Sequence, residues 1–547
     1  MQWNEEVDLL SVGSGFGGLV AAIRGHDLGL KTMVIEKSSR IGGAAAYSLG
    51  LVWVPNNHVM KSKKIQDSTE EAIEVLDSIQ MFKGLVDERV RKRWVEAAPV
   101  VAEYLESRCG VKWQICELPD PLYPKVPGSK EMGRLLEVMP MSLSELGEFK
   151  DRLQLSPHYP YFVTVNEVMG WGGPASYKDF DFALINKRIS EECAALGVGL
   201  IAYLVKAAIS RSVPILNEVP ARKLVQENGR VIGVKCEKNG QDYYVHAKKG
   251  VVLNLGGYDW HPILPLYYER VSEWHATSPP SIEGDHIMLG GEVGAIILHV
   301  PLRTLKPLGF HIPGEEHFDK PVYRYVRTEP GYPHIIFVNR RGERFVDESS
   351  TSMLIKVWEY DYRTLSYPNF PTFGIWDEQF RERYPLGSIE PGVPYPAGMV
   401  ETGGTIQELA RKLRIDEEVL TKTVHRFNKF ASKGIDEDFG RGSLQRSDMF
   451  CGDPKNKPNP YLGTIEKPPF YGLKFIVAST GAANCGYRID ERGGVLDFGG
   501  NHIPALFACG NCVAATDLGT GYVDGGMLSR SMTFGYVAAE EVKKGGD

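Results

Sequence analysis

The segment Gly-Ser-Gly-Phe-Gly-Gly at positions 13–18 constrains this chain more than any other feature. An apolar stretch precedes it, an alanine-containing stretch follows, and a second apolar run ends at Glu36. Gly13 permits a tight turn, Gly15 lets the backbone approach a pyrophosphate, and Gly18 lets a helix pack closely on a strand. An acid in the place of Glu36 binds ribose hydroxyls. The sequence therefore predicts an α/β fold with a Rossmann-like dinucleotide-binding unit near the amino terminus.

Further glycine-containing segments distinguish between the possible dinucleotides. One directly follows Glu36, and two others follow apolar strand-like runs near positions 250–255 and 505–509. An NAD site does not require such additional close approaches of the backbone, whereas the long, extended FAD molecule does. The sequence thus favours FAD over NAD. Outside the first unit, the predicted cofactor-binding residues are Gly42, Gly43, Ser48, Gly256, Gly257, Gly510 and Asn511.

Bulk properties limit the class of protein and its partners. The chain has 547 residues, 43% of them apolar, and a formal net charge of -7, with no basic stripe. It is long enough for two domains, and its charge argues against nucleic acid as a partner. The acidic first residues do not resemble a signal peptide. The apolar run at 194–205 is too short to span a bilayer, so we expect a buried helix there and no transmembrane segment.

Eight cysteines are scattered along the chain without the spacing of a disulfide framework. Cys509 and Cys512 form a CxxC pair, but this pair lies in a predicted cofactor-contacting strand end and has no second pair nearby. We therefore predict neither a metal site nor dithiol chemistry. Reduced thiols are typical of a cytoplasmic protein.

The order of the segments predicts a discontinuous cofactor domain. Because all glycine segments must meet one FAD, residues 1–278 and 461–547 are assigned to an FAD-binding domain and 279–460 to an inserted α+β catalytic domain. An Asn-Gly hairpin is expected at 224–234 and a second hairpin at 335–348. A helix is expected to begin in the hinge near Asp285. Helices are also expected at 406–413 and 417–430, with a return linker at 454–460.

The order of these motifs resembles the fumarate reductase-type FAD flavoprotein superfamily, and within it the 3-ketosteroid Δ1-dehydrogenases and related ketone desaturases. The resemblance runs from the first glycine segment through Gly42–Gly43 and the 335–348 segment to the carboxyl terminus. Tyr47–Ser48 is similar to the flavin-side loop of that branch, and 518–526 to its terminal Tyr-x-x-x-Gly signature. The superfamily's covalent flavin needs a His where Ala44–Ala45 stand here, so the resemblance implies noncovalent FAD.

The resemblance also implies a chemistry. Desaturation beside a ketone needs donors for the developing enolate oxygen, a base for the α proton and a flavin that accepts the β hydride. By similarity with the family, the Tyr522 hydroxyl and the Gly526 backbone N–H are the donors. Ser352 stands where the steroid enzymes have a Tyr, and serine is a poor base. Tyr123 lies roughly where the family keeps another active-site tyrosine.

A tyrosine has a reference pKa near 10, so a tyrosine base needs help from the enolate site, a second phenol or a nearby cation. Tyr203, Tyr360 and Tyr362 are further candidates for this role or for the wall of the substrate pocket, as is Trp113 for the wall. The expected partner is a small cyclic ketone, either a 3-ketosteroid or a smaller ring such as cyclohexanone. The sequence does not identify the electron acceptor.

Two alternatives stay open. A fumarate reductase-like enzyme would use an Arg proton donor where Ser352 stands, and a His for which the segment Ser479-Thr480-Gly481 offers no candidate. A catalytically inert flavin-binding protein would explain the loss of the base. The sequence favours ketone desaturation over both.

Overall fold

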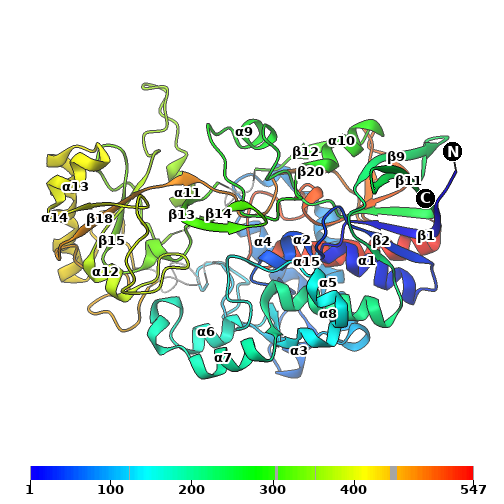
Figure 1. Ribbon diagram of the computed structural model, residues 1–547, viewed down its shortest axis with the longest axis horizontal. Coiled ribbons are helices and arrows are strands. Elements are labelled where there is room, and N and C mark those ends of the chain that lie inside the picture. Colours follow the sequence, from blue (N-terminus) through cyan, green and yellow to red (C-terminus); the bar gives the residue numbers. More distant parts are fainter. Residues whose placement is uncertain (1, 122, 302–305, 351–352, 444–451, 546–547) are drawn as a thin grey trace.

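The computed structural model describes residues 2–121, 123–301, 306–350, 353–443 and 452–545. In Figure 1 it has two lobes. The right-hand lobe carries both labelled ends of the chain, and the left-hand lobe carries α12, α13 and α14. Strands β13 and β14 lie between the lobes.

The right-hand lobe is built on an eight-stranded sheet with the order β21-β22-β11-β1-β2-β8, to which β10 and β9 are added beside β11. The strands β22, β11, β1, β2 and β8 are parallel to one another, which confirms the predicted Rossmann-like unit. The bounds of these strands are β1 Glu5–Val12, β2 Thr32–Ile35, β8 Ile215–Leu216, β9 Ala221–Glu227, β10 Arg230–Lys238, β11 Gln241–Leu253, β21 Gly494–Leu496 and β22 His502–Ala508.

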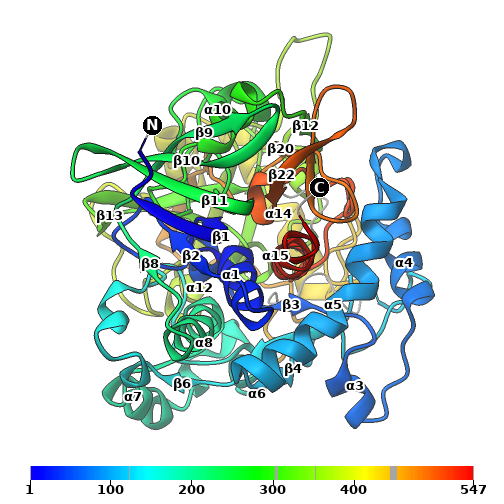
Figure 2. The same cartoon turned by 90° about the vertical axis from the view of Figure 1, so that its right-hand side faces the viewer.

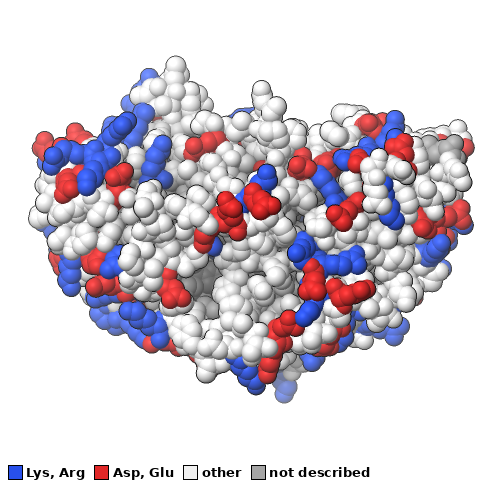
Figure 3. Space-filling view, in the orientation of Figure 1, with Lys and Arg blue, Asp and Glu red and all other residues white. Residues whose placement is uncertain are grey.

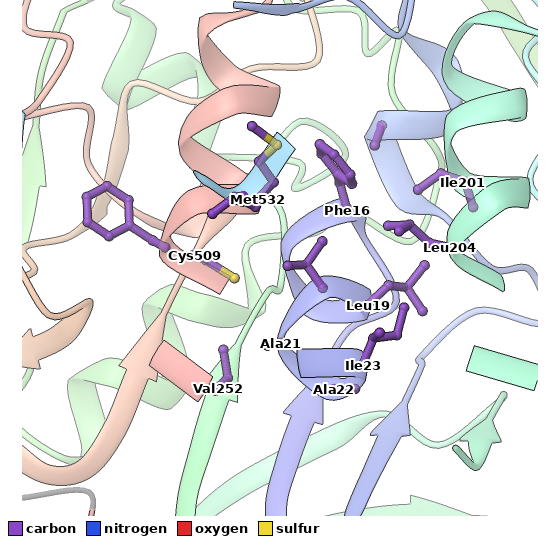
Figure 4. Packing of buried hydrophobic residues seen from close by; sticks show 14 of the residues in the cluster. Phe16, Leu19, Ala21, Ala22, Ile23, Ile201, Leu204, Val252, Cys509 and Met532 are labelled. Carbon is purple, nitrogen blue, oxygen red and sulfur yellow. The ribbon is translucent and has the colours of Figure 1, made fainter. Parts of the chain in front are cut away.

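Helices bury one face of this sheet (Figure 2). In the close view, side chains of α1 such as Phe16 and Leu19 lie between Met532 of α15 and Ile201 of α8 (Figure 4). These side chains belong to one continuous hydrophobic core. Burying a side chain of this size typically contributes about 1.5–3 kcal/mol, so the core fixes α1 and the glycine turn before it. The helices are α1 Phe16–Asp27, α5 Glu88–Cys109, α8 Leu196–Ser210 and α15 Gly526–Lys544.

Two local predictions for this lobe are confirmed. The hairpin of β9 and β10 turns at Asn228 and Gly229, with φ of 50° and 80°, the left-handed conformation that an Asn-Gly turn supplies. The apolar run at 194–205 forms most of the buried helix α8. None of the helices in the described ranges is long and apolar enough to cross a membrane.

The left-hand lobe is an α+β insert with a four-stranded antiparallel sheet, β15-β16-β18-β17. One hydrophobic cluster covers each side of this sheet, and the helices predicted at 406–413 and 417–430 pack in one of them. A three-stranded sheet, β14-β13-β19, joins the insert to the other lobe. The elements are β13 Leu308–His317, β14 Lys320–Tyr325, β15 Ile335–Val338, α11 Met353–Val357, β16 Phe373–Asp377, α12 Glu378–Arg383, β17 Glu401–Gly403, α13 Ile406–Leu413, α14 Glu417–Lys433, β18 Phe470–Lys474 and β19 Ile476–Val477.

The predicted hairpin at 335–348 is only half formed. The first strand, β15, and the glycine turn are present, but the chain after Gly342 is not a strand, and β15 pairs with β16 instead. Arg344 explains the difference, because its guanidinium is buried between the carboxylates of Glu348 and Asp436. This ion pairing ties the segment to Asp436 just beyond α14, and Glu348 accepts from the Phe337 backbone N–H of β15 at 3.3 Å in place of strand pairing.

The predicted boundaries of the insert also differ from the observed packing. Residues around α10 (Asp285–Glu292) and β12 (Ile297–His299) pack with the cofactor lobe, since Leu289 and Ala295 belong to its core. At the other end, β18 belongs to the sheet of the insert, so 454–460 is a loop within the insert and not the return linker. Apart from Ala175, the residues of the insert's own clusters lie between Leu308 and Phe475.

Several shorter helices and strands complete the fold around the main sheets. Charges of both signs are interspersed on the face drawn in Figure 3. The remaining elements are α2 Gly43–Tyr47, β3 Val52–Trp53, α3 His58–Ser62, α4 Thr69–Ser78, β4 Trp113–Ile115, β5 Leu135–Val138, β6 Met141–Ser142, α6 Val165–Gly170, α7 Phe182–Ser190, β7 Cys193–Ala194, α9 Leu264–Glu269 and β20 Cys485–Tyr487.

Candidate active site

A cavity opens at the carboxyl ends of β1, β2 and β11 and extends to β14 and the start of α15. The carboxyl edge of a parallel sheet is the usual ligand site of such folds. Glu36 lies on the cavity among the residues of the sheet edge, and Tyr325 and Tyr522 are contributed by the insert side and by the segment before α15. The cavity therefore combines the predicted dinucleotide cradle with aromatic side chains from distant parts of the chain.

Most of the predicted cofactor residues line this cavity: Gly13, Gly15, Glu36, Gly43, Ser48, Gly256, Gly510 and Asn511. The other three predicted glycines serve packing around it. A Cβ atom at Gly18 would clash with the carbonyl of Gly13, one at Gly42 would lie 3.0 Å from Ile201, and one at Gly257 would lie 2.8 Å from Ala483. The predicted role of Gly18 in close helix–strand packing matches this geometry.

Glu36 is held in place by local hydrogen bonds. Its carboxylate accepts bonds from the Ser14 backbone N–H at 2.9 Å, the Ser14 hydroxyl at 2.7 Å and the Ser38 N–H at 2.8 Å. Burial raises the pKa of Glu36 above its usual value. A carboxylate has about four lone-pair sites, so these three bonds orient Glu36 and leave acceptor capacity for a ribose hydroxyl.

The backbone around this end fits an extended dinucleotide. A Cβ atom at Gly15 would clash with the side chain of Asn254, so the turn tolerates only glycine there. At Gly43, which has φ of 54°, a Cβ atom would project into space where the nearest heavy atom is the Gly15 Cα at 3.8 Å. The two glycine segments thus approach each other to van der Waals distance, and both line the cavity beside the amino terminus of α1, the kind of position that favours a pyrophosphate.

Cys509 and Cys512 lie buried beneath this cradle. The Cys512 thiol donates to the carbonyl of Cys509 at 3.1 Å, and burial raises the pKa of Cys512 to about 12. A thiol that keeps its proton is a poor nucleophile and a poor metal ligand. Their arrangement supports a structural role for the pair.

Hydrogen bonds at Asp517 and Thr520 hold the loop that carries Tyr522. The buried Asp517 accepts from the Arg530 guanidinium at 2.6 Å, and the Thr520 hydroxyl accepts from the backbone of Met81 and Phe82. Burial, and to a lesser degree the neighbouring Asp524 carboxylate, raise the pKa of Tyr522 above its ordinary value. Tyr522 therefore keeps its proton and is a hydrogen-bond donor on the cavity wall.

A second group of polar side chains lines the same part of the cavity. The hydroxyls of Tyr159 and Tyr325 are 2.6 Å apart, and Arg327 donates to the Tyr325 hydroxyl at 3.4 Å and to Asp524 at 3.1 Å. Burial raises the pKa of Tyr159 well above its ordinary value. Burial opposes the charge of Arg327, yet Tyr325 and Asp524 hold its pKa well above the usual range. The group thus contains a permanent cation beside a pair of phenols.

The prediction for Gly526 needs correction. Gly526 is buried, and its N–H donates to the carbonyl of Val523 at 3.0 Å rather than into the cavity. Helix α15 begins at this residue, and the amides of Met527 and Leu528 belong to its first turn. Amides of a first turn have no acceptor within the helix, and both residues line the cavity. The amino terminus of α15, rather than Gly526 itself, therefore presents backbone donors to this space.

The structure does not place Trp113, Tyr203, Tyr360 or Tyr123 among the residues that line the cavity. Trp113 packs in the core and donates to the Ala102 carbonyl at 3.0 Å, and Tyr203 donates to the Met139 carbonyl at 3.1 Å, because both follow the apolar faces of their elements. Tyr360 packs against Tyr362 on the surface of the insert. Tyr123 lies in a surface turn away from the lining residues, and Ser352 lies outside the described residues.

Sequence reasoning missed Tyr159, Tyr325, Arg327 and His158, all of which line the cavity. The signal for two of them was present, because side chains two apart in an extended strand share a face. Tyr325, the last residue of β14, and Arg327, two residues after it, have this spacing. Burial lowers the pKa of His158 to about 4, so this imidazole is neutral, and it bonds the Thr277 carbonyl at 2.7 Å.

The fold and the site together define a flavoprotein with a dinucleotide lobe and an inserted lobe. The chain belongs to the FAD-binding domain family, whose model matches residues 8–526, and FAD is its cofactor. This finding confirms the predicted fold class and the choice of FAD over NAD.

Relatives extend the comparison over nearly the whole chain. A 3-oxosteroid 1-dehydrogenase of Mycolicibacterium smegmatis is 31% identical over 98% of this chain and 97% of its own length. A 4-oxocyclohexanecarboxylate 2-dehydrogenase of Sinomonas cyclohexanicum is 30% identical over 98% of this chain and 92% of its own. The crystal structure of the 3-ketosteroid delta1-dehydrogenase of Sterolibacterium denitrificans matches with a TM-score of 0.88 at 29% identity, covering 99% and 100% of the two chains. These likenesses confirm the predicted resemblance to that branch.

Proposed function

We propose that this protein is an FAD-dependent oxidoreductase that desaturates a cyclic ketone between its α and β carbons. One observation carries the proposal: a single cavity joins the FAD cradle to the phenols of Tyr159, Tyr325 and Tyr522. The relatives named above act on ring ketones, as their names state. Bound FAD, held noncovalently because alanines stand at 44 and 45, supplies the acceptor for the β hydride.

Tyr522 binds the carbonyl oxygen of the ketone. Its raised pKa keeps it protonated, so it donates a hydrogen bond that strengthens as the oxygen becomes an enolate. The free first-turn amides of α15 add to the positive potential at this end, since a helix amino terminus favours negative charge. A donor of this kind, placed in advance in a water-poor site, contributes about 3–4 kcal/mol when tested by removal.

Tyr325 takes the α proton. It satisfies two of the conditions for a tyrosine base, because Tyr159 is a second phenol at 2.6 Å and Arg327 a cation at 3.4 Å. Tyr159 keeps its own proton owing to burial and donates it in a hydrogen bond to the Tyr325 oxygen. An opposite charge within a few ångströms favours the charged form of a titrating group. Tyr325 thus replaces Ser352 and Tyr123 as the proposed proton acceptor.

The substrate is a cyclic ketone of either size, a 3-ketosteroid or a smaller ring. The direct test is anaerobic mixing of the purified holoenzyme with a panel that runs from cyclohexanone to a 3-ketosteroid, with succinate as the dicarboxylate control. Bleaching of the flavin by at least one ring ketone, with formation of the enone and no response to succinate, is the expected result. The test needs no added electron acceptor, because it follows a single turnover.

Two results would contradict the proposal. Bleaching by succinate without any by ketones would indicate the fumarate reductase-like alternative. A flavin that no ketone and no dicarboxylate reduces would indicate the inert flavin-binding alternative.

A further inference from the structure

The ion pair of Arg327 and Asp524 joins two parts of the molecule that are distant in sequence. Arg327 lies two residues beyond β14, whereas Asp524 lies two residues after Tyr522 on the loop before α15. The guanidinium and the carboxylate are 3.1 Å apart, and both residues line the cavity. Their side chains are 31% and 20% exposed, so each keeps contact with the cavity space.

The position of this pair relative to the phenols is informative. The Arg327 guanidinium donates to the hydroxyl of the proposed base, Tyr325, at 3.4 Å. Its ion pair with Asp524 links it to the loop that carries the proposed carbonyl donor, Tyr522. The two functions need a fixed separation, since proton removal and carbonyl binding act on neighbouring atoms of one ring. A misplacement of about 1 Å can cost about a hundredfold in rate.

We propose that Arg327 is a positioning residue: paired with Asp524, it sets the base against the carbonyl donor, and its charge stabilises the phenolate form of Tyr325 that accepts the proton. The inference rests on the proposed function, and it adds to that function a residue for which the family resemblance predicts no role. Arg327 acts through Tyr325 and Asp524, and no contact between Arg327 and the reacting atoms is required.

The charged and titratable groups that face Arg327 define what its charge can act on. Tyr325 is the last residue of β14, two residues before Arg327. Tyr159 and His158 come from the segment between Gln154 and Val163. Tyr522 and Asp524 come from the loop before α15, and Glu329 accepts from the Arg327 backbone N–H at 3.1 Å. His158 is neutral above about pH 4, so in the neutral range the cation of this group is Arg327.

The chain offers a matched control three residues away. Arg324 lies on β14 and forms an ion pair with Glu315 at 2.9 Å, but it is not among the cavity residues. Arg324→Met removes the same kind of side chain and the same kind of ion pair from the neighbouring strand β14. A general loss of strand stability would therefore affect both variants alike.

The experiment measures the rate of anaerobic flavin reduction by a saturating ring ketone against pH, for wild type, Arg327→Met, Arg327→Lys, Asp524→Asn and Arg324→Met. Flavin absorbance and unfolding temperature are recorded first, so that folded holoenzyme is compared. For Arg327→Met we expect a rate about 10²-fold lower near neutral pH. We also expect the rise of the rate with pH to move upward by about one unit or more, because the cation is lost.

The conservative variants separate charge from position. Arg327→Lys keeps the charge but not the planar fork, so the pH profile should stay near that of wild type while the maximal rate falls. Asp524→Asn leaves the Arg327 charge without its carboxylate, so the pH profile should move downward. Arg324→Met should keep the wild-type profile.

Several outcomes would overturn the inference. It fails if Arg327→Met lowers the rate by one factor at all pH values without moving the profile, or if Arg324→Met matches it. It also fails if wild type is not reduced by any ring ketone, in which case the proposed function fails first. If ring ketones reduce the flavin of the wild type but the pH profile of Arg327→Met is not shifted, this inference fails and the proposed function stands.

Discussion

The two ends of the cavity are built in different ways. The cofactor end consists of backbone at glycine turns that directly follow β1 and β11, and its side-chain acid, Glu36, follows β2. The ketone end consists of side chains from three segments, around Tyr159, Tyr325 and Tyr522, that meet only in the folded molecule. The first end depends on local conformation, and the second depends on how the insert packs against the cofactor lobe.

This difference has a consequence for mutation. At the cofactor end a single added methyl group meets backbone or a fixed side chain, so steric changes remove the ligand. At the ketone end we expect removal of one hydroxyl to leave the fold and the bound flavin intact and to lower the rate of flavin reduction.

Gly15→Val should abolish activity through loss of FAD. Its Cβ would clash with the side chain of Asn254 at the turn that the pyrophosphate must approach. The purified variant is expected to lack the flavin absorbance. Gly84→Ala, at an exposed position with nothing within 4 Å of the added Cβ, is the control and should keep its flavin. A Gly15→Val protein with full flavin content would contradict the assignment of the cradle.

Tyr325→Phe should keep FAD but reduce it with a ring ketone about 10³-fold more slowly, as expected for loss of a general base. Stopped-flow absorbance under anaerobic conditions measures the rate. Tyr323→Phe is the matched control, because Tyr323 is on the same strand, packs against His275 and His311 and is not among the residues that line the cavity. If both variants reduce their flavin at the wild-type rate, Tyr325 is not the base.

Tyr522→Phe should lower the same rate about 10²–10³-fold, the cost of removing one preplaced donor to a developing oxyanion. The flavin content should be unchanged. Tyr536→Phe on α15, whose ring packs against Tyr104, serves as control. A wild-type rate in Tyr522→Phe would show that the carbonyl binds elsewhere.

Tyr203→Phe should have the smallest effect, on stability rather than on rate. Its hydroxyl donates to the Met139 carbonyl at 3.1 Å and does not reach the cavity. Loss of one such hydrogen bond costs about 0.5–1.5 kcal/mol of unfolding free energy. Chemical denaturation measures this cost, and the rate of flavin reduction should equal that of wild type. A large drop in rate would restore Tyr203 to the substrate pocket.

The sequence predicted the cofactor end because its signals are local. A glycine turn after an apolar strand, an Asn-Gly hairpin at 228–229 and the apolar run of α8 each fix a conformation within a few residues. The failure at 335–348 shows the limit of this reasoning. There the strand-like pattern lost to a tertiary ion-pair group, in which Arg344 binds Glu348 and Asp436.

The ketone end was harder to predict because it is a convergence of side chains. Tyr522 was identified from the resemblance, but its partners come from β14 and from the segment near Tyr159, and no spacing in the sequence links these. The expectation that a tyrosine base needs a second phenol or a cation stays a prediction, and the sequence offered Tyr123 rather than Tyr325 as a candidate for that base. The predicted domain boundaries could not include the packing of Leu289 and Ala295 with the cofactor core, because such packing is a tertiary property.

The most direct test of the account is a crystal structure of the holoenzyme with a bound dienone or other unreactive ring ketone. We expect the ketone oxygen within about 3 Å of the Tyr522 hydroxyl, a hydrogen-bond distance, with the adjacent ring carbon facing the Tyr325 hydroxyl. A ketone oxygen bonded to Arg327 or to Tyr325 instead, with Tyr522 turned away from the ligand, would contradict the account.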